Sequence, residues 1–388
     1  MRHAVHDDHR PLKDGVSAAI PRPTLSIVVP AFHCAAMLRR CLQGLQASTL
    51  SRSAWELIVV DDGSTDNTSD VARATADRVL RIEDGPRGPA NARNLGARAA
   101  RGTVLVFIDA DVVVAPSTLC GFAAHFAADP TLGAAFGAYD DAPAATDFIS
   151  QYRNLLHRYV HILQPGDAET FWAGCGAVRR DIFLAVGGFD SARYPRPQIE
   201  DIELGYRLRA GGTRIILDPA LTGTHLKRWT FSDMVRTDLR ARAIPWMRLV
   251  LRRGELLQHG PLNLGAAEKL YTVLTALAAV TLTLGMLLAN MLLFAIAALC
   301  LAVVLLGNAT LLSWFAARRG ARFTAGVALF RLLYYFESGL GAAWAILSHR
   351  RATNTLALTP LQPITDGKDT VCPHVGLRPL STHQQMAS

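Results

Sequence analysis

A long segment without charge constrains this chain more than any other feature. Between Lys269 and Arg318 lie 48 residues with no charged side chain. As one helix, at about 1.5 Å per residue, the segment would be about 70 Å long. A hydrocarbon layer of about 30 Å is crossed by roughly 20 residues. The segment therefore predicts two membrane crossings, with Gly285 and Asn290 at the turn between them. A buried helix pair in a soluble protein is the alternative.

A third apolar stretch, residues 323–347, contains two charged residues, Arg331 and Glu337. Each would cost about 2.5–3.5 kcal/mol at the centre of a bilayer. The stretch could therefore span the membrane, re-enter it or lie in the interface, and the sequence leaves these three possibilities open. The predicted membrane domain, residues 266–350, thus has two or three helices.

Basic residues flank the uncharged segment on both sides. Residues 227–253 contain eight lysines and arginines against two aspartates, and three arginines occur in residues 318–322. Positive flanks stay in the cytoplasm, so we expect a multi-pass protein of the cell inner membrane with a cytoplasmic N-terminal domain. Residues 227–265 are predicted to be a basic amphipathic segment lying against anionic lipid, and a solvated basic face is the alternative. Nothing resembles a nucleic-acid module, so no nucleic-acid partner is expected.

The ends of the chain are polar. Residues 1–22 are predicted to be a disordered tail without a secretory signal, and residues 351–388 to be a second polar tail. Six cysteines are scattered along the chain with no CxxC pair. This pattern predicts reduced, structural thiols.

The predicted N-terminal domain, residues 23–226, alternates apolar runs with helical patterns. Unbroken apolar runs predict strands over residues 25–30, 55–62, 78–82 and 103–111. Helical spacing occurs over residues 35–48, and Pro89 opens another helix. This alternation is typical of an α/β fold whose parallel sheet is covered by helices on both faces. Ligands of such sheets bind beyond the carboxyl ends of the strands.

Acidic residues form the carboxyl ends of two of these strands, as Asp61-Asp62 and as Asp109-Ala110-Asp111. The chain has no GxGxxG after its first strand and no GxxxxGK[ST], which argues against a dinucleotide dehydrogenase and excludes a P-loop. A divalent metal could hold a phosphorylated ligand instead, because hard cations bind carboxylates together with substrate phosphates. A solvated strand end is the alternative for the Asp-x-Asp pair.

Five motifs occur in this order along the chain: IVVPAF, ELIVVDDGSTDNT, GPANARNLGARAARGTVLVFIDADV, GCGAVRRDIFLAVGGFD and IEDIELGYRLRAGG. Together they resemble family 2 glycosyltransferases of the GT-A fold. The resemblance covers roughly residues 24–230. It implies a nucleotide-diphospho-sugar transferase fold with a mainly parallel sheet. Many members carry C-terminal helices, which implies a membrane-anchored bacterial type.

The resemblance also implies which residues bind the donor and a metal, Mn²⁺ or Mg²⁺. Pro30 and Phe32 would border the nucleobase, and Asp62 would accept its N–H. Arg93 would contact the nucleotide, Asp109 would contact the ribose and the metal, and Asp111 would bind the metal. His225 would complete the metal shell, or would belong to an acceptor-binding HxxRW element with Trp229. The alternatives are a surface role for Arg93 and a turn-capping role for Asp61 or Asp66.

Asp201 matches the catalytic base of the family, with Glu200 as its neighbour. A sugar hydroxyl is a poor nucleophile and needs a base that takes its proton. One base opposite a metal-held leaving group implies displacement with inversion. Capping of a helix N-terminus is the alternative for this acidic pair. Trp172 and Gly174 resemble the wall around the acceptor, although a packed strand is the alternative there.

We therefore expect an inverting glycosyltransferase that moves a sugar from a nucleotide-diphospho-sugar to a lipid, glycan or other membrane-associated acceptor. A processive polysaccharide synthase is a second hypothesis, but the sequence reads HxxRW where those enzymes carry QxxRW. A non-catalytic membrane scaffold of the same fold is a third. The presence of both acidic motifs argues against a non-catalytic scaffold.

Overall fold

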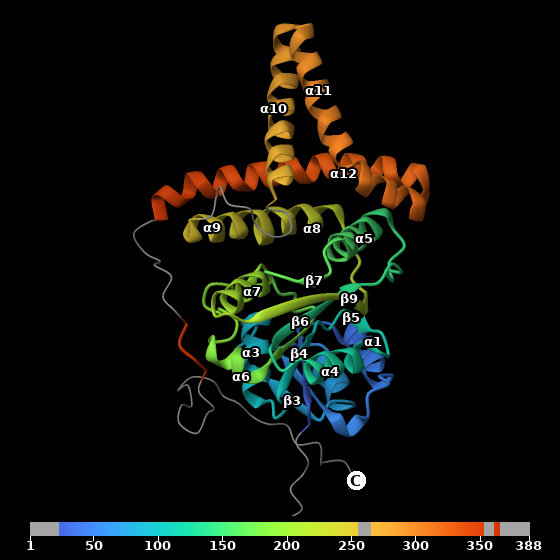
Figure 1. Cartoon of the computed structure of the whole chain (residues 1–388), viewed down its shortest axis with the longest axis vertical. Helices are drawn as coiled ribbons and strands as arrows, with labels where there is room; N and C mark the ends of the chain where they lie inside the picture. The colour runs from blue at the N-terminus through green and yellow to red at the C-terminus, as the bar shows by residue number, and fades with distance from the viewer. Residues whose placement is uncertain (1–22, 255–264, 353–360, 365–388) are drawn as a thin grey trace, which may run out of the picture.

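A computed structural model describes residues 23–254, 265–352 and 361–364. Figure 1 shows three parts along its long axis: a domain built on a sheet, a layer of helices across that domain, and a two-helix hairpin that points away from the layer. The tail predicted over residues 1–22 and most of the tail predicted over residues 351–388 lie outside the described residues.

One nine-stranded sheet forms the centre of the first part. The strands are β1 (Leu25–Ala31), β2 (Trp55–Asp61), β3 (Arg78–Arg81), β4 (Val104–Ile108), β5 (Val112–Val114), β6 (Leu132–Tyr139), β7 (Gly166–Asp167), β8 (Cys175–Arg179) and β9 (Arg214–His225). Their order is β3-β2-β1-β4-β8-β6-β9-β5, with β7 paired to β9. The parallel pairing predicted for the first four strands is confirmed. β8 then pairs antiparallel with both β4 and β6, so the later strands make the sheet mixed.

Helices cover both faces of this sheet, as predicted. One buried cluster joins the sheet to α1 (Ala35–Gln46), α2 (Thr68–Arg73) and α4 (Thr118–Ala128), and a second joins it to α3 (Pro89–Ala99), α6 (Arg180–Ala185) and α7 (Glu200–Ala210). In β1, Ile27 and Val29 belong to the first cluster and Val28 to the second. Successive strand residues face opposite sides of a sheet, which explains why this run is apolar throughout.

The strand predicted over residues 103–111 is shorter than expected. β4 ends at Ile108, where the Asp109 N–H donates to the Gly174 carbonyl, and the Val112 N–H donates back to the Asp109 carbonyl at 2.9 Å. The chain then turns into β5, which pairs antiparallel with β9. Asp109 and Asp111 therefore lie in a turn at the carboxyl end of β4 and not within the strand.

The layer of helices contains α5 (Phe148–Leu163), α8 (Phe231–Arg236), a π-helical turn η2 (Thr237–Ala243), α9 (Ile244–Arg253) and α12 (Ala309–Ala352). Figure 1 shows α8 and α9 between the sheet domain and α12. Three apolar residues of the segment predicted to lie against lipid, Trp229, Leu249 and Val250, do not face lipid, because all three are buried. Trp229, for example, packs in a cluster with residues of α5 and α12. Lipid binding by the exposed arginines of this segment stays a prediction.

Most of the uncharged segment lies in the hairpin of α10 (Ala266–Leu288) and α11 (Met291–Gly307). Its turn lies where predicted, since the Asn290 N–H donates to the Gly285 carbonyl and the Asn290 side chain accepts the Leu292 N–H at 2.9 Å. Within the described ranges, α10 is the one helix that is long and apolar enough to cross a membrane. α11 and α12 meet that criterion only as a pair bent by 63°.

The third apolar stretch belongs to α12, which lies across the base of the hairpin in Figure 1. Gly320, with φ 79°, breaks this helix. Arg331 is buried and ion-paired with Glu268 of α10 at 3.2 Å, and its Nε donates to Asn308 at 3.0 Å. The charge of Arg331 thus has protein partners, and these contacts tie α12 to the base of the hairpin.

Candidate active site

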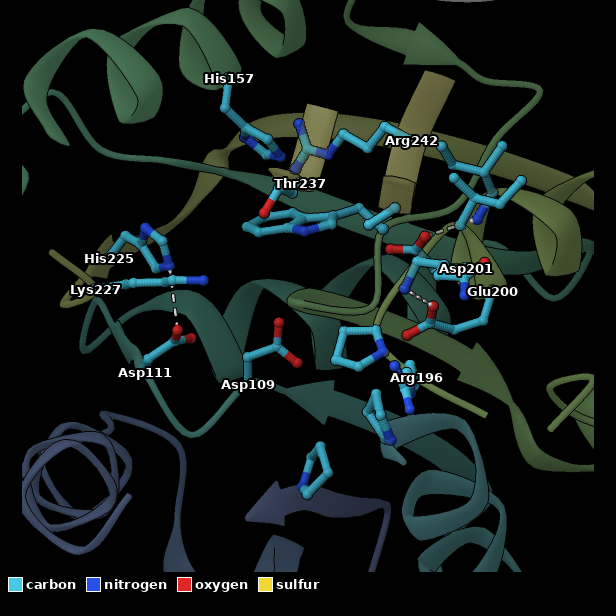
Figure 2. Close-up of a pocket in the computed structure, with 18 of the residues that line it drawn as sticks. Asp109, Asp111, His157, Arg196, Glu200, Asp201, His225, Lys227, Thr237 and Arg242 are labelled. Atoms are coloured by element: carbon cyan, nitrogen blue, oxygen red, sulfur yellow. Dashed lines mark hydrogen bonds and ion pairs between the residues drawn. The ribbon is translucent and has the colours of Figure 1, made fainter. Parts of the chain in front are cut away.

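A cavity of about 840 Å³ opens between the sheet domain and the layer of helices. Sequence-predicted site residues from distant parts of the chain line it: Pro30, Phe32, Asp62, Arg93, Asp109, Asp111, Trp172, Glu200, Asp201, His225 and Trp229. Figure 2 shows five of them, Asp109, Asp111, Glu200, Asp201 and His225, around one space. Gly174 does not line the cavity. A Cβ at that position would lie 2.6 Å from the Trp172 ring, so this glycine makes room for the indole.

The end of the cavity near β1 and β2 contains Pro30, Phe32 and Asp62. Phe32 is 41% exposed, which leaves much of its ring accessible. The buried Asp62 carboxylate accepts the backbone N–H groups of Arg87 at 2.8 Å and Gly88 at 2.7 Å. Burial, opposed by these two hydrogen bonds, raises its pKa above the usual value. Asp62 therefore holds the turn before α3, and lone pairs of its oxygens remain for a ligand.

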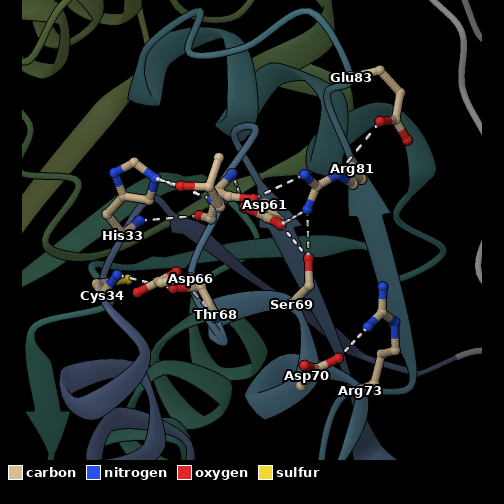
Figure 3. Close-up of polar contacts among 12 residues, drawn as sticks. His33, Cys34, Asp61, Asp66, Thr68, Ser69, Asp70, Arg73, Arg81 and Glu83 are labelled. Atoms are coloured by element: carbon tan, nitrogen blue, oxygen red, sulfur yellow. Dashed lines mark hydrogen bonds and ion pairs between the residues drawn. The ribbon is translucent and has the colours of Figure 1, made fainter.

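Asp61 and Asp66 have the structural roles that the sequence left open, as Figure 3 shows. Asp61 accepts the Ser64 N–H at 2.9 Å and pairs with Arg81 at 2.7 Å. Asp66 accepts the Thr68 N–H at 3.1 Å at the start of α2. Neither aspartate lines the cavity. These contacts fix the loop that follows β2, and Asp62 is thereby positioned at the cavity wall.

Arg93 is buried and bridges two carboxylates of the site. Its Nη2 lies 2.6 Å from Asp109 Oδ1 and its Nη1 lies 3.0 Å from Glu200 Oε1. Burial lowers the pKa of Arg93, but the charges of Asp109 and Glu200 outweigh burial and raise it. The surface role considered for Arg93 is therefore wrong, because its side chain is only 6% exposed. The arginine joins α3, the turn after β4 and the first turn of α7.

Asp111 and His225 are the two residues that best fit a metal. Asp111 Oδ2 lies 3.3 Å from His225 Nε2, and Asn154 Oδ1 lies 2.6 Å from His225 Nδ1. The His225 ring also stacks on Tyr139, with centroids 4.6 Å apart. Burial raises the pKa of Asp111, yet the hydrogen bond and charge of His225 hold it below the usual value.

The side-chain atoms around Asp111 and His225 show whether this pair can bind a metal. A metal would take the place of the proton between His225 Nε2 and Asp111: Asn154 Oδ1 would then accept the Nδ1 proton of a neutral imidazole, and the Nε2 lone pair and the Asp111 carboxylate would both face the ion. Asp109 is held by Arg93, and no three His, Cys, Asp or Glu side chains of the described chain form a metal cluster. Asp111 and His225 therefore suit a divalent ion whose other ligands are phosphate oxygens and water.

Asp201 lies in the first turn of α7, as predicted. Its Oδ2 accepts the Ala173 N–H at 3.2 Å, and its Oδ1 accepts the Ile202 N–H at 2.8 Å. Burial, and then the charge of Glu200, raise the pKa of Asp201 to about 7. A carboxylate with this pKa can accept a proton at neutral pH, which is what a general base requires.

Sequence reasoning missed the cavity wall formed by the layer of helices. His157 and Arg153 come from α5, Arg242 from η2, and Tyr334 from α12. His157 and His161 lie four residues apart on one face of α5, and this spacing was a usable signal. Arg242 carried no such signal, because it is one of eight basic residues in residues 227–253.

Comparison with known proteins shows which family the sequence matches. Residues 26–187 match the sequence profile of glycosyl transferase family 2. Validoxylamine A glucosyltransferase of Streptomyces hygroscopicus subsp. jinggangensis (strain 5008) is 34% identical over 231 residues, 49% of this chain and 52% of the relative. Glycosyltransferase AglE of Haloferax volcanii is 34% identical over 93 residues, 23% of this chain and 31% of the relative. The chain thus spans about half the length, or less, of these curated relatives.

A solved structure supports the fold. The mannosyltransferase PcManGT from Pyrobaculum calidifontis, in complex with GDP-Man and Mn²⁺, superposes with a TM-score of 0.52 at 21% identity. The match covers 84% of this chain and 88% of that protein. Residues 26–187 therefore match glycosyl transferase family 2, and the domain that contains them has the GT-A fold.

Proposed function

We propose that the chain is an inverting glycosyltransferase that moves a sugar from a nucleotide-diphospho-sugar to a lipid or other membrane-associated acceptor. One observation carries this proposal: the Asp111–His225 pair and Asp201 line the same cavity from different elements. This is the arrangement expected of a leaving-group site and a base that act on one substrate pair. The named glycosyltransferases among the relatives support the reaction class.

The donor nucleotide is proposed to lie at the end of the cavity that contains Phe32 and Asp62. A divalent metal, when bound by Asp111 and His225, would offset the charge of the departing diphosphate. The Mn²⁺ in the mannosyltransferase of the same fold is in line with this assignment. Arg93 would hold Asp109 and Glu200 in fixed positions around the donor, because both carboxylates contact its guanidinium.

Asp201 would take the proton of the acceptor hydroxyl as that oxygen attacks the anomeric carbon of the donor. The neighbouring carboxylate of Glu200 is bound to Arg93 and to the Gln198 N–H, so it is not free to act as a nucleophile. A single displacement with inversion follows. The contacts of His225 with Asp111 and Asn154 favour its metal role over an acceptor-binding role.

The hairpin supports the proposed membrane association. Apolar side chains in the middle of α10 and α11 are exposed, with Val280 at 55% and Leu299 at 66%. A monomeric soluble protein rarely exposes a large contiguous apolar surface. We propose that the hairpin enters the bilayer and that the exposed arginines of residues 227–253 lie on the cytoplasmic side.

Replacement of the base tests the proposal. Asp201→Asn should retain nucleotide binding and lose sugar transfer by about 10²–10⁴-fold, the usual cost of removing a general base. Asp181→Asn is the matched control, because Asp181 is exposed on α6 and does not line the cavity. Transfer by Asp201→Asn at the rate of the control would contradict the role of Asp201.

A further inference from the structure

The layer of helices contributes one arginine to the cavity that the proposed reaction does not use. Arg242 comes from the π-helical turn η2, and turns of this kind often occur at functional sites. Figure 2 shows Arg242 near His157 and Thr237, across the cavity from Asp109 and Asp111. Tyr334 and Ser338 of α12 line the same cavity. This side of the cavity therefore faces α12, which lies across the base of the hairpin proposed to enter the membrane.

The positive charge of Arg242 is not balanced by a nearby carboxylate. Asp238, the acidic residue with the largest effect on the pKa of Arg242, is already bound to Arg153, whose Nη1 lies 3.0 Å from Asp238 Oδ2. Arg153 and Asp238 are both buried, at 7% and 6% exposed. The charge of Arg153, and then burial, lower the pKa of Arg242 to about 10. No hydrogen bond or ion pair of Arg242 is present among the described residues, and its side chain is exposed to the cavity.

Two further polar groups lie on this side of the cavity. His157 Nδ1 is buried and has no hydrogen-bond partner in the described part of the chain. Burial, and then the charge of His161, lower the pKa of His157 well below its usual value, so the ring is neutral and can present one N–H. The Thr237 side chain also lines the cavity. A guanidinium, an imidazole N–H and a hydroxyl provide donors for a group with several oxygens.

The position of Arg242 separates it from the proposed donor site. The proposed metal ligands lie across the cavity, as Figure 2 shows, and the charge of Asp201 contributes to the pKa of Arg242. The base is therefore within electrostatic reach of Arg242. An anion bound by Arg242 would consequently belong to the acceptor and not to the diphosphate of the donor.

We propose that Arg242, with His157 and Thr237, binds a phosphate group of the acceptor. This inference rests on the proposed function and specifies its acceptor as a phosphate ester. A phosphate has three oxygens and up to two charges, which suits three donors around one arginine better than a planar carboxylate does. The phosphate could belong to a lipid or to a water-soluble ester, and both sources have the same chemistry at Arg242.

Binding of defined probes to the full-length protein in neutral detergent tests this site without donor or turnover. The probes are dodecyl phosphate, inorganic phosphate and dodecanol, and the signal is fluorescence of the tryptophans that line the cavity, Trp172, Trp229 and Trp246. Arg242→Gln should bind dodecyl phosphate about 10–100-fold more weakly than the wild type, as for loss of a charged hydrogen bond. Arg240→Gln is the matched control, because Arg240 is exposed on the same turn but does not line the cavity.

The probes also distinguish the sources of the phosphate. Arg242-dependent binding of dodecyl phosphate but not of inorganic phosphate supports a lipid phosphate, whereas similar binding of both supports a soluble ester. Arg242→Lys keeps the charge but loses the planar fork, so it should also bind dodecyl phosphate more weakly than the wild type. This variant replaces Arg242→Gln in the comparison if Arg242→Gln fails to fold. Equal affinities of the Arg242 variants and the Arg240→Gln control, or no binding of either phosphate probe, would overturn the proposal. If dodecyl phosphate binds in an Arg242-dependent way but the protein transfers no sugar, the result would contradict the proposed function and leave the phosphate site standing.

Discussion

Arg93 and Glu200 lie 107 residues apart in the sequence and form a buried ion pair, with Nη1 and Oε1 3.0 Å apart. Each side chain is 6% exposed. The pair connects α3 to the first turn of α7, where Glu200 adjoins the proposed base, Asp201. Because Arg93 also binds Asp109, a single guanidinium links the proposed donor site to the acidic pair that would activate the acceptor.

The charge of Glu200 should raise the pKa of Asp201, the proposed base. Burial is the first cause of the raised pKa of Asp201, near 7, and the charge of Glu200 is the second. The base acts when deprotonated, so transfer should fall as the pH drops below about 7 and should level off above it. Glu200→Gln removes a negative charge, lowers the pKa of Asp201 and should move this acid limb to lower pH. A pH–rate profile of sugar transfer measures the shift.

The exposed Glu169 supplies the control, since it does not line the cavity. Glu169→Gln should leave the acid limb where it is in the wild type. An acid limb that stays in place in Glu200→Gln, or that moves to higher pH, would show that Glu200 does not raise the pKa of Asp201.

Loss of Arg93 should destabilise the fold. Arg93→Met leaves Glu200 buried without its cation, and breaking a buried pair in this way typically costs about 3–5 kcal/mol in the free energy of unfolding. Arg73→Met breaks an exposed pair, in which the side chain of Arg73 is 39% exposed and that of Asp70 is 74% exposed. This change should cost about 0–1 kcal/mol in the free energy of unfolding. Denaturant unfolding of the two variants gives the comparison, and equal losses would refute a stabilising role of the buried pair.

His225 should set the metal requirement. A ligand must be a neutral imidazole, so His225→Ala should raise the concentration of Mn²⁺ needed for half-maximal rate, and excess Mn²⁺ should partly restore the rate. His125→Ala is the control, because His125 pairs with Asp218 at 2.7 Å and does not line the cavity. Titrating metal and acceptor separately decides between the two roles. A change confined to the acceptor titration would assign His225 to acceptor binding.

The hairpin should anchor the protein through its exposed middle turns. An aspartate at the centre of a membrane helix costs about 2.5–3.5 kcal/mol on insertion scales, so Val280→Asp with Leu299→Asp should reduce flotation with lipid vesicles. Leu163→Asp is the matched control, since Leu163 is 53% exposed at the end of α5. Unchanged flotation of the double variant would contradict insertion of the hairpin.

The sequence predicted those features that depend on local patterns. The apolar runs of β1 and β2 located the sheet, and the acidic residues after β2 and β4 located its ligand-binding edge. The pairing of Arg93 with Glu200 was not predictable, because it depends on how α7 packs on the sheet. Nor was the burial of Trp229, which follows from its packing with α5 and α12.

Release of nucleoside diphosphate from a panel of nucleotide sugars, with membrane extract as acceptor, tests the central claim most directly. The wild type should release nucleoside diphosphate from at least one donor in the presence of Mn²⁺ or Mg²⁺. Asp111→Asn, which removes a proposed metal ligand, should show no turnover and weaker metal-dependent nucleotide binding while remaining folded. Full activity of Asp111→Asn in the presence of a chelator, or no release from any donor by the wild type, would contradict a metal-assisted glycosyltransferase.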